Sequence, residues 1–404
     1  MTRRVVITGY GAVSPLGHNA ADTWAGLCAG RSAIGPIVNQ PTDRMIVKVA
    51  GEVRGFDPTA HFDSKRLPLL DRFSQFALLA AREALKMSGL SVDETNTTRI
   101  GVVVGSGAMG MHTLEDGYRR LYEEGNWRLH PLTVPRLMTS APSSQIAIEF
   151  KLRGPSFSVS SACASANHGI AQALSLLRNG QADAVLAGGT EAPLSFGCLK
   201  AWEALRVMAQ DTCRPFSKDR RGMVMGEGGA MFVLETVEHA HRRGATIFAE
   251  IAGAGMSSDA GDIVLPDAAG AARAMSLALA DAGLTPEDIG YINAHGTGTP
   301  ANDPMETDAI RRVFGDHARR LLVSSSKSML GHALGASGAL ELLATIKAIE
   351  TGIVPPTANF TEPDPACDLD YVPNVAREQP VRAAISNSFA FGGLNAVLAL
   401  RKFE

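Results

Sequence analysis

The chain has 404 residues, of which 45% are hydrophobic, and a formal net charge of −3. This length and composition can bury a large core and favour two or three domain-sized units. The balanced charge excludes nucleic acid as the main partner, and five scattered cysteines without a CxxC pair exclude a disulfide framework or a zinc site.

The N-terminal segment, residues 1–9, predicts a first strand rather than a signal peptide, because its apolar stretch is short and ends in threonine and glycine. No segment approaches the roughly 18 uninterrupted apolar residues of a transmembrane helix. We therefore expect no membrane association. The unpaired cysteines favour the reducing environment of the cytoplasm.

Two stretches of the chain follow the same plan. Residues 80–101 predict an amphipathic helix, a Gly-Leu helix stop, a turn and a strand that begins with Ile-Gly, and residues 271–290 repeat this order. A second echo follows. Residues 159–164 (VSSACA) precede one long helix, and residues 323–328 (VSSSKS) precede another at 332–350. Two echoes in the same order indicate an internal duplication.

Short apolar strands, such as residues 184–187 and 231–234, alternate with these helices. This alternation predicts an α/β architecture with mainly parallel sheets. The echoes divide the chain into two similar halves, 1–245 and 246–404.

Cys163 lies in a run of small residues, 159–169, directly before an apolar helix. A thiol at a helix N-terminus feels the positive end of the macrodipole, which predicts a lowered pKa and a nucleophilic thiolate. A buried structural cysteine is the alternative for a lone thiol.

Three segments of the second half are rich in catalytic residue types. They are residues 293–306, with His295 at the end of a strand and Glu306 in the following helix; residues 326–338, with Lys327 and His332; and residues 387–395, an aromatic, glycine-rich loop. Each alone has a structural explanation: a hydrogen-bonded histidine, an ion pair, a packed turn.

Together these segments closely resemble the β-ketoacyl-acyl-carrier-protein synthases, condensing enzymes of the thiolase fold. The resemblance extends over essentially the whole chain and is closest to synthase II. It implies an internally duplicated αβαβα layered architecture with mostly parallel mixed sheets. It rests on the Cys163 segment, His295-Gly-Thr-Gly-Thr-Pro, Lys327 with Gly331-His332, and Phe391-Gly-Gly.

The resemblance also implies the chemistry. Cys163 would carry the acyl chain as a thioester, and His295 and His332 would stabilise the enolate formed when a malonyl thioester loses carbon dioxide. The backbone N–H groups of Cys163 and Phe391, in a gate loop with Gly392, would form the oxyanion hole.

Two further pairs of residues complete the implied site. Lys327 would support the His332 side and pair with Glu306. Thr297 and Thr299 would contact the phosphopantetheine arm of acyl carrier protein, which delivers both substrates. No metal or nucleotide cofactor is implied, and a homodimer is the usual assembly of the fold.

Related chemistries remain as alternatives. Thiolases use a second cysteine near the C-terminus, but Cys367 lacks the glycine-rich setting, and starter condensing enzymes have asparagine where this chain has His332. A chain-length subunit would lack the nucleophile. A simple thioester hydrolase remains as another enzyme class.

Several positions depart from the housekeeping pattern of the family. Ala108 replaces a bulky aliphatic residue and Thr133 an aromatic that commonly reaches across the dimer, and both changes predict an enlarged or reshaped acyl tunnel. Ala390 replaces a glycine, which is freely permitted at positive φ, and is expected to stiffen or redirect the gate loop. Phe389 is a further candidate substrate-binding residue. Residues 262–266 also depart from the usual loop beside the gate. These changes favour a specialised synthase for long, rigid or unsaturated chains, similar to the nodulation-type, aryl-polyene and type II polyketide enzymes. Such a synthase can form a heterodimer with a chain-length-factor paralogue. The alternative is a housekeeping fatty-acid synthase II with neutral changes.

Overall fold

The computed structural model describes residues 3–404, and ten of its strands form one mixed sheet. These are β1 (Val5–Val13), β4 (Ile100–Gly105), β5 (Ser156–Val159), β6 (Ala184–Glu191), β7 (Gly228–Thr236), β8 (Ala249–Ser258), β9 (Tyr291–Asn293), β10 (Leu322–Ser324), β13 (Ala383–Ala390) and β14 (Leu394–Arg401). Their order in the sheet is β10-β9-β13-β14-β8-β1-β7-β6-β4-β5.

The order of the strands repeats the same pattern in each half of the sheet. We number the five strands of each half in chain order. From the edge of the sheet to its middle, both halves then have the order third, second, fourth, fifth, first. The two first strands, β1 and β8, pair in the middle of the sheet. In both halves the second strand pairs in parallel with the third and with the fourth, and the remaining pairs of strands are antiparallel. The sheet is therefore mixed, with parallel pairs confined to its two ends. The predicted duplication of an α/β unit is visible in this topology.

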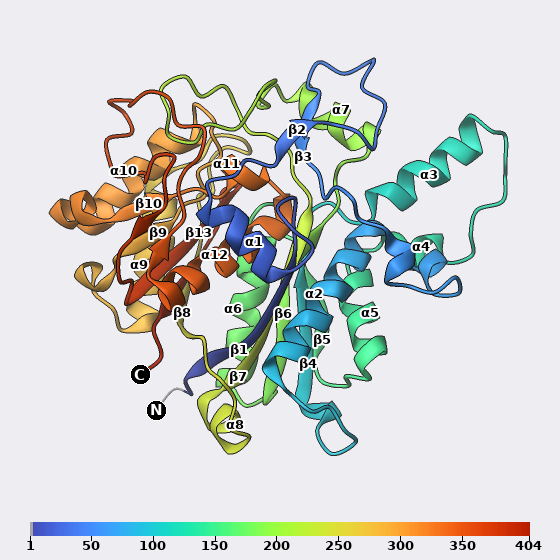
Figure 1. The fold of residues 1–404 in the computed structure, drawn as a ribbon, viewed down its shortest axis with the longest axis horizontal. Helices are drawn as coiled ribbons and strands as arrows, with labels where there is room; N and C mark the ends of the chain where they lie inside the picture. Colours follow the sequence, from blue (N-terminus) through green and yellow to red (C-terminus); the bar gives the residue numbers. More distant parts are fainter. Residues whose placement is uncertain (1–2) are drawn as a thin grey trace.

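Helices enclose and separate the two halves of the sheet (Figure 1). On the outer faces, α2 and α5 pack on the first half, and α9 with α10 on the second, while α6 and α12 pack against each other between the halves. The layers thus run αβαβα, as expected. Their bounds are α2 (Arg72–Ser88), α5 (Ala141–Phe150), α6 (Ser165–Arg178), α9 (Ala268–Ala282), α10 (Asn302–Phe314) and α12 (Ser337–Thr351).

The helix–strand repeat seen in the sequence is confirmed. The outer helix α2 ends at Gly89 and its counterpart α9 at Gly283, both left-handed with φ of 62° and 64°. A glycine tolerates this conformation without a Cβ clash, so both helices stop and turn into a strand. Those strands are β4 and β9.

The second echo places Cys163 and Lys327 at corresponding points, since each follows the third strand of its half. Cys163 lies two residues before α6, and Lys327 begins the short helix α11 (Lys327–Leu330). The long helix expected at 332–350 begins later, at Ser337, because a turn of 3-10 helix, η6 (Leu334–Ala336), follows His332.

The remaining elements lie around this core. They are α1 (Ala20–Cys28), β2 (Ile34–Pro36), β3 (Val49–Gly51), α3 (Met111–Tyr122), α4 (Thr133–Leu137), α7 (Phe196–Ala204), α8 (Val237–Arg242), β11 (Ile353–Val354) and β12 (Arg377–Glu378). In Figure 1, α3 and the loop that leads to α4 project from the body. The division predicted at residues 245 and 246 falls between α8 and β8 and stays a prediction. No helix within residues 3–404 is long and apolar enough to cross a membrane.

Candidate active site

Cys163 is presented by a strained turn between β5 and α6. Ala162 has φ of 48°, a left-handed conformation that non-glycine residues rarely adopt. The hydroxyl of Ser165 holds the turn, accepting from the Ser161 backbone N–H at 2.9 Å and donating to the Ala162 carbonyl at 2.6 Å. The Cys163 side chain is 5% exposed. It is therefore fixed at the floor of a recess rather than free on the surface.

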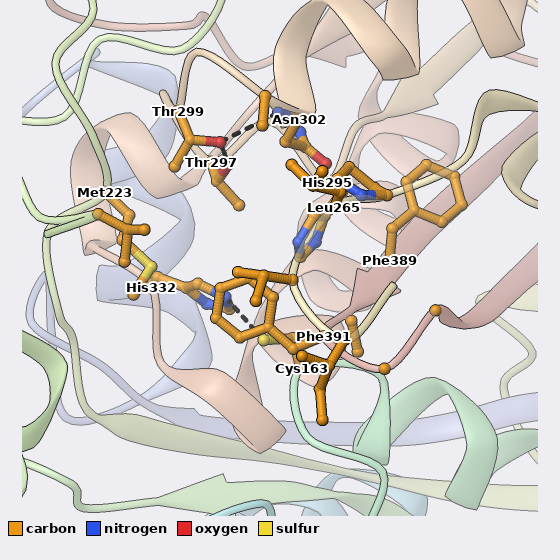
Figure 2. Close-up of a pocket in the computed structure, with 18 of the residues that line it drawn as sticks. Cys163, Met223, Leu265, His295, Thr297, Thr299, Asn302, His332, Phe389 and Phe391 are labelled. Carbon is orange, nitrogen blue, oxygen red and sulfur yellow. Dashed lines mark hydrogen bonds between the residues drawn. The ribbon is translucent and has the colours of Figure 1, made fainter. Parts of the chain in front are cut away.

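His332 faces this thiol from the second half of the chain. Its Nε2 lies 3.1 Å from Cys163 Sγ, the dashed contact in Figure 2. Its Nδ1 accepts a hydrogen bond from the Leu334 backbone N–H at 3.2 Å and contacts Ser337 Oγ at 2.8 Å. Because a backbone N–H can only donate, the neutral ring carries its proton on Nε2. His332 thus directs an N–H donor at the thiol and the adjacent cavity.

His295 lies beside His332, with ring centroids 5.5 Å apart and an angle of 84° between the rings. Lys327 Nζ approaches its Nδ1 at 3.4 Å and donates to its backbone carbonyl at 2.6 Å. An ammonium is only a donor, so it favours the tautomer of His295 with the proton on Nε2. Both histidines can therefore present N–H donors to one acceptor atom.

Burial sets the protonation of both rings. It lowers the pKa of His295 and of His332 well below the usual histidine value, and the positive charge of Lys327 acts in the same direction. At neutral pH both rings are neutral hydrogen-bond donors, which suits stabilisation of an oxyanion better than proton removal.

The buried cation Lys327 forms its ion pair with Glu341 of α12. The prediction that Lys327 forms an ion pair with Glu306 is wrong. Glu306 accepts the backbone N–H groups of His295 and Gly296, both at 2.8 Å, and so fixes the loop after β9. Glu341 reaches Lys327 because α12 passes through the middle of the molecule, a proximity that sequence spacing did not reveal.

The pKa of the Cys163 thiol is raised, whereas the sequence predicts that it is lowered. Burial raises its pKa to about 12, and the charge of Lys327 and the residue's own backbone N–H oppose that rise only in part. The predicted lowering by the helix N-terminus is therefore wrong in direction. The thiol is enclosed more completely than a run of small residues suggested, and desolvation disfavours the thiolate.

Alkylation with iodoacetamide measures this acidity. Because the thiolate is the reactive form, the rate at Cys163 should rise about tenfold per pH unit from pH 7 to 9, without a plateau. Glutathione, alkylated in parallel, should begin to level off near its ordinary thiol pKa of about 8.5. A rate at Cys163 that is already constant above pH 7 would contradict the raised pKa.

A cavity of about 190 Å³ opens above Cys163 and both histidines (Figure 2). Thr297 and Thr299 form part of its wall, and their hydroxyls lie 2.9 Å apart. The lining is largely apolar, so that a narrow chain can enter while the polar groups converge at the base. The lining residues are Cys163, Trp202, Val207, Met223, residues 263–266, His295, Thr297, Thr299, Ala301, Asn302, His332 and residues 389–393.

The loop after β13 closes one side of this cavity. The ring of Phe391 stacks on Trp202 with centroids 5.9 Å apart, and the Gly392 N–H donates to the Ile263 carbonyl at 2.8 Å. Ala390 ends β13 and does not need a positive φ, and the left-handed positions of the loop are Gly392 and Gly393. This hydrogen bond joins the gate loop to residues 262–266, both of which depart from the family pattern.

The predicted residues do not all meet in this cavity. Cys163, His295, Thr297, Thr299, His332, Phe389, Phe391 and Gly392 line it. Lys327 and Glu306 lie behind the histidines. Ala108 packs against the apolar cluster that contains Cys163 without lining the cavity, and Thr133 lies on α4, away from it.

Sequence reasoning missed several residues of the site. No motif marks Trp202, near the end of α7, or Met223, in the loop before β7. Glu341 was detectable in principle, because it is an acid flanked by the apolar residues Leu340 and Leu342, and a buried acid needs a partner.

Comparison with known proteins yields related sequences and folds. The sequence matches the Beta-ketoacyl synthase, N-terminal domain over residues 2–240 and the Beta-ketoacyl synthase, C-terminal domain over residues 248–361. It is 54% identical over 402 residues to nodulation protein E of Rhizobium sp. (strain N33), covering 100% of both chains. It is 46% identical over 408 residues to 3-oxoacyl-[acyl-carrier-protein] synthase 2 of Coxiella burnetii, covering 99% of each. The structure titled the ishigamide ketosynthase/chain length factor matches with a TM-score of 0.96 at 38% identity, covering 100% of both chains.

Proposed function

The chain belongs to the beta-ketoacyl synthase family and is a condensing acyltransferase, and on that premise we propose how its residues divide the reaction. Cys163 takes an acyl chain from acyl carrier protein as a thioester, and its proton leaves on the released carrier thiol. The 3.1 Å contact between His332 Nε2 and Cys163 Sγ carries this proposal, because it joins the nucleophile to the histidine pair.

The second substrate is a malonyl thioester on the same type of carrier. Its thioester carbonyl accepts hydrogen bonds from the Nε2–H groups of His295 and His332, so that the enolate left by departing carbon dioxide is stabilised. The enolate carbon then attacks the acyl carbon on Cys163. A new carbon–carbon bond forms, and the thiolate of Cys163 leaves. Donors from the backbone of Cys163 and Phe391 stabilise the intervening oxyanion.

His332→Ala should separate these steps. Removing one preorganised donor costs about 10²–10³ in rate, so malonyl decarboxylation should fall by that factor. Acyl loading of Cys163 should fall much less, because the thiol itself is intact. Radiolabelled carbon dioxide release and acyl-enzyme mass measure the two steps. Equal losses in both would contradict the assigned role.

We infer that acyl carrier protein is the partner that delivers both substrates, and that Thr297 and Thr299 contact its phosphopantetheine arm. Both threonines line the cavity, and the Thr299 hydroxyl also accepts the Asn302 backbone N–H at 3.1 Å. Free pantetheine keeps the contacts of the arm but lacks the protein part of the carrier, so a carrier protein that is itself recognised should make its substrate far better used than the same acyl group on free pantetheine. Equal use of both would contradict this inference.

The acyl chain is proposed to be long, rigid or unsaturated, rather than the saturated chain of housekeeping synthesis. The higher identity to nodulation protein E than to the synthase 2 relative supports a specialised synthase, and the small side chain of Ala108 beside the apolar cluster of Cys163 supports a reshaped tunnel. Turnover of saturated and polyunsaturated acyl-carrier proteins of equal length tests it directly. If saturated chains up to palmitoyl are turned over as well as the polyunsaturated ones, the proposal is wrong and the housekeeping synthase II is the better assignment.

Ala108→Ile tests the tunnel itself. Isoleucine would fill the space proposed for the far end of the chain. Overpacking costs roughly 1–3 kcal/mol, so turnover of the longest chains should fall about 5- to 150-fold, while short chains are used as before. Ala301→Ile, at the mouth of the cavity, serves as the control and should affect all chain lengths alike. A uniform loss in Ala108→Ile would show that this residue does not sense chain length.

We further propose that a second subunit, a copy of this chain or a chain-length-factor paralogue, covers β5. This strand lies at an edge of the sheet and carries Phe157, which is 36% exposed, and the neighbouring helix α5 carries Ile148, which is 67% exposed. Edge strands with apolar surroundings favour pairing with another chain. Sedimentation of the protein alone and with such a paralogue tests this, and a monomer in both would contradict it.

A further inference from the structure

Glu191 is a buried carboxylate that the reaction described above does not use. It is the last residue of β6, is 0% exposed, and does not line the cavity. One oxygen accepts from Ser106 Oγ at 2.9 Å and from the Ala108 N–H at 3.1 Å. The other accepts from the Gly107 N–H at 2.6 Å and from the Gly335 N–H at 3.0 Å. Four donors thus converge on one side chain.

These donors come from both sides of the candidate active site. Residues 106–108 press against the Cys163 turn, since a Cβ built on Gly107 would lie 3.1 Å from the Ala162 carbonyl oxygen. Gly335 belongs to η6, and its neighbour Leu334 donates to Nδ1 of His332. Glu191 therefore connects the support of the nucleophile to the support of the histidine donor.

The internal duplication supplies a counterpart. The loop after β9 donates the N–H groups of His295 and Gly296 to Glu306, and the loop after β4 donates those of Gly107 and Ala108 to Glu191. Each second strand is thus followed by a loop held on a buried carboxylate. Only Glu191 also reaches across, through Gly335, into the other half of the chain.

We propose that Glu191 is a positioning residue that sets the acyl chain on Cys163 against the enolate held at His332. Its loss leaves each half-site largely able to act, but misaligns the two reacting carbons. A misplacement of about 1 Å can cost roughly 100-fold in rate. This inference rests on the proposed function, because it concerns the joining of the two half-reactions.

Glutamine at position 191 is the smallest informative change. Burial raises the pKa of Glu191 to about 7, and the donors oppose that rise, so the carboxylate prevails at pH 8.5. In the best orientation of a glutamine, its oxygen keeps Gly107 and Gly335, and its amide donates to Ser106 Oγ. The Ala108 N–H then faces an NH₂ group and loses its acceptor, so the loop beside Cys163 must shift.

The readout is the partition of malonyl groups at pH 8.5. The wild-type enzyme should release one carbon dioxide for each β-ketoacyl product. In Glu191→Gln, condensation should fall roughly 10- to 100-fold and decarboxylation by less than about threefold. The surplus enolate takes up a proton and leaves as an acetyl thioester, so carbon dioxide and acetyl carrier should both exceed the β-ketoacyl product.

Glu83→Gln is the matched control. Glu83 also accepts backbone N–H groups, from Ala12 at 2.9 Å and Ala20 at 3.0 Å, but lies on α2 outside the cavity. It should change stability without changing the partition. Ser106→Ala removes a single donor to Glu191 and should also raise the ratio of carbon dioxide to β-ketoacyl product. If Glu191→Gln does not fold, this variant provides the test.

The possible results separate the two levels of the proposal. A native one-to-one partition in the folded Glu191 and Ser106 variants, or the same uncoupling in Glu83→Gln, would overturn the role of Glu191. A wild-type enzyme that consumes malonyl carrier without forming a β-ketoacyl product would overturn the proposed function instead.

Discussion

Replacing Cys163 by alanine is expected to abolish condensation completely while leaving malonyl decarboxylation measurable. The acyl chain then has no sulfur to bind, and no other cysteine lines the cavity. His295 and His332 keep their partners, Lys327 on one side and Leu334 on the other, so the enolate can still form. The products should be carbon dioxide and an acetyl thioester, measured by label release and mass spectrometry of the carrier.

The result is interpretable only for a folded protein. Although Cys163 is only 5% exposed, the substitution removes a single sulfur atom, so the loss of stability should be modest, about 1 kcal/mol. Cys198→Ala is a suitable control because Cys198 is also buried but does not line the cavity. Residual β-ketoacyl formation in Cys163→Ala would assign the nucleophile elsewhere.

Repetition in the sequence predicted most of the fold. The helix–stop–strand plan repeated at 80–101 and 271–290 predicts two α/β units, and both appear with the same strand order. Local patterns also placed Cys163 and Lys327 after corresponding strands. These features were accessible because helix stops and buried strands are encoded by a few adjacent residues.

Contacts between residues that are far apart in the chain could not be predicted from the sequence. Glu341 lies 14 residues after Lys327 and Glu191 lies 144 residues before Gly335, and only packing of α12 and η6 brings them together. The raised pKa of Cys163 could not be predicted from the sequence either. The helix N-terminus is a local feature, whereas the desolvation that outweighs it depends on residues from both halves of the chain.

Lys327→Met is expected to be the most destabilising single change in the site. Lys327 and Glu341 are each 1% exposed, and within residues 3–404 each forms an ion pair with the other alone. Removing one partner leaves an uncompensated buried charge, which costs about 3–5 kcal/mol. Condensation should also be lost, because Nδ1 of His295 no longer faces a fixed donor. Chemical denaturation and the condensation assay measure the two effects.

The double variant Lys327→Met with Glu341→Met separates these effects. Replacing a buried ion pair by apolar residues of similar size is often neutral for stability, so most of the lost free energy of unfolding should return. Activity should not return, because the contact at 3.4 Å between Lys327 Nζ and His295 Nδ1 is still missing and the ring can take either tautomer. A double variant that regains condensation along with stability would show that Lys327 serves only to neutralise Glu341. A stable but inactive one would establish that the ion pair orients the histidine.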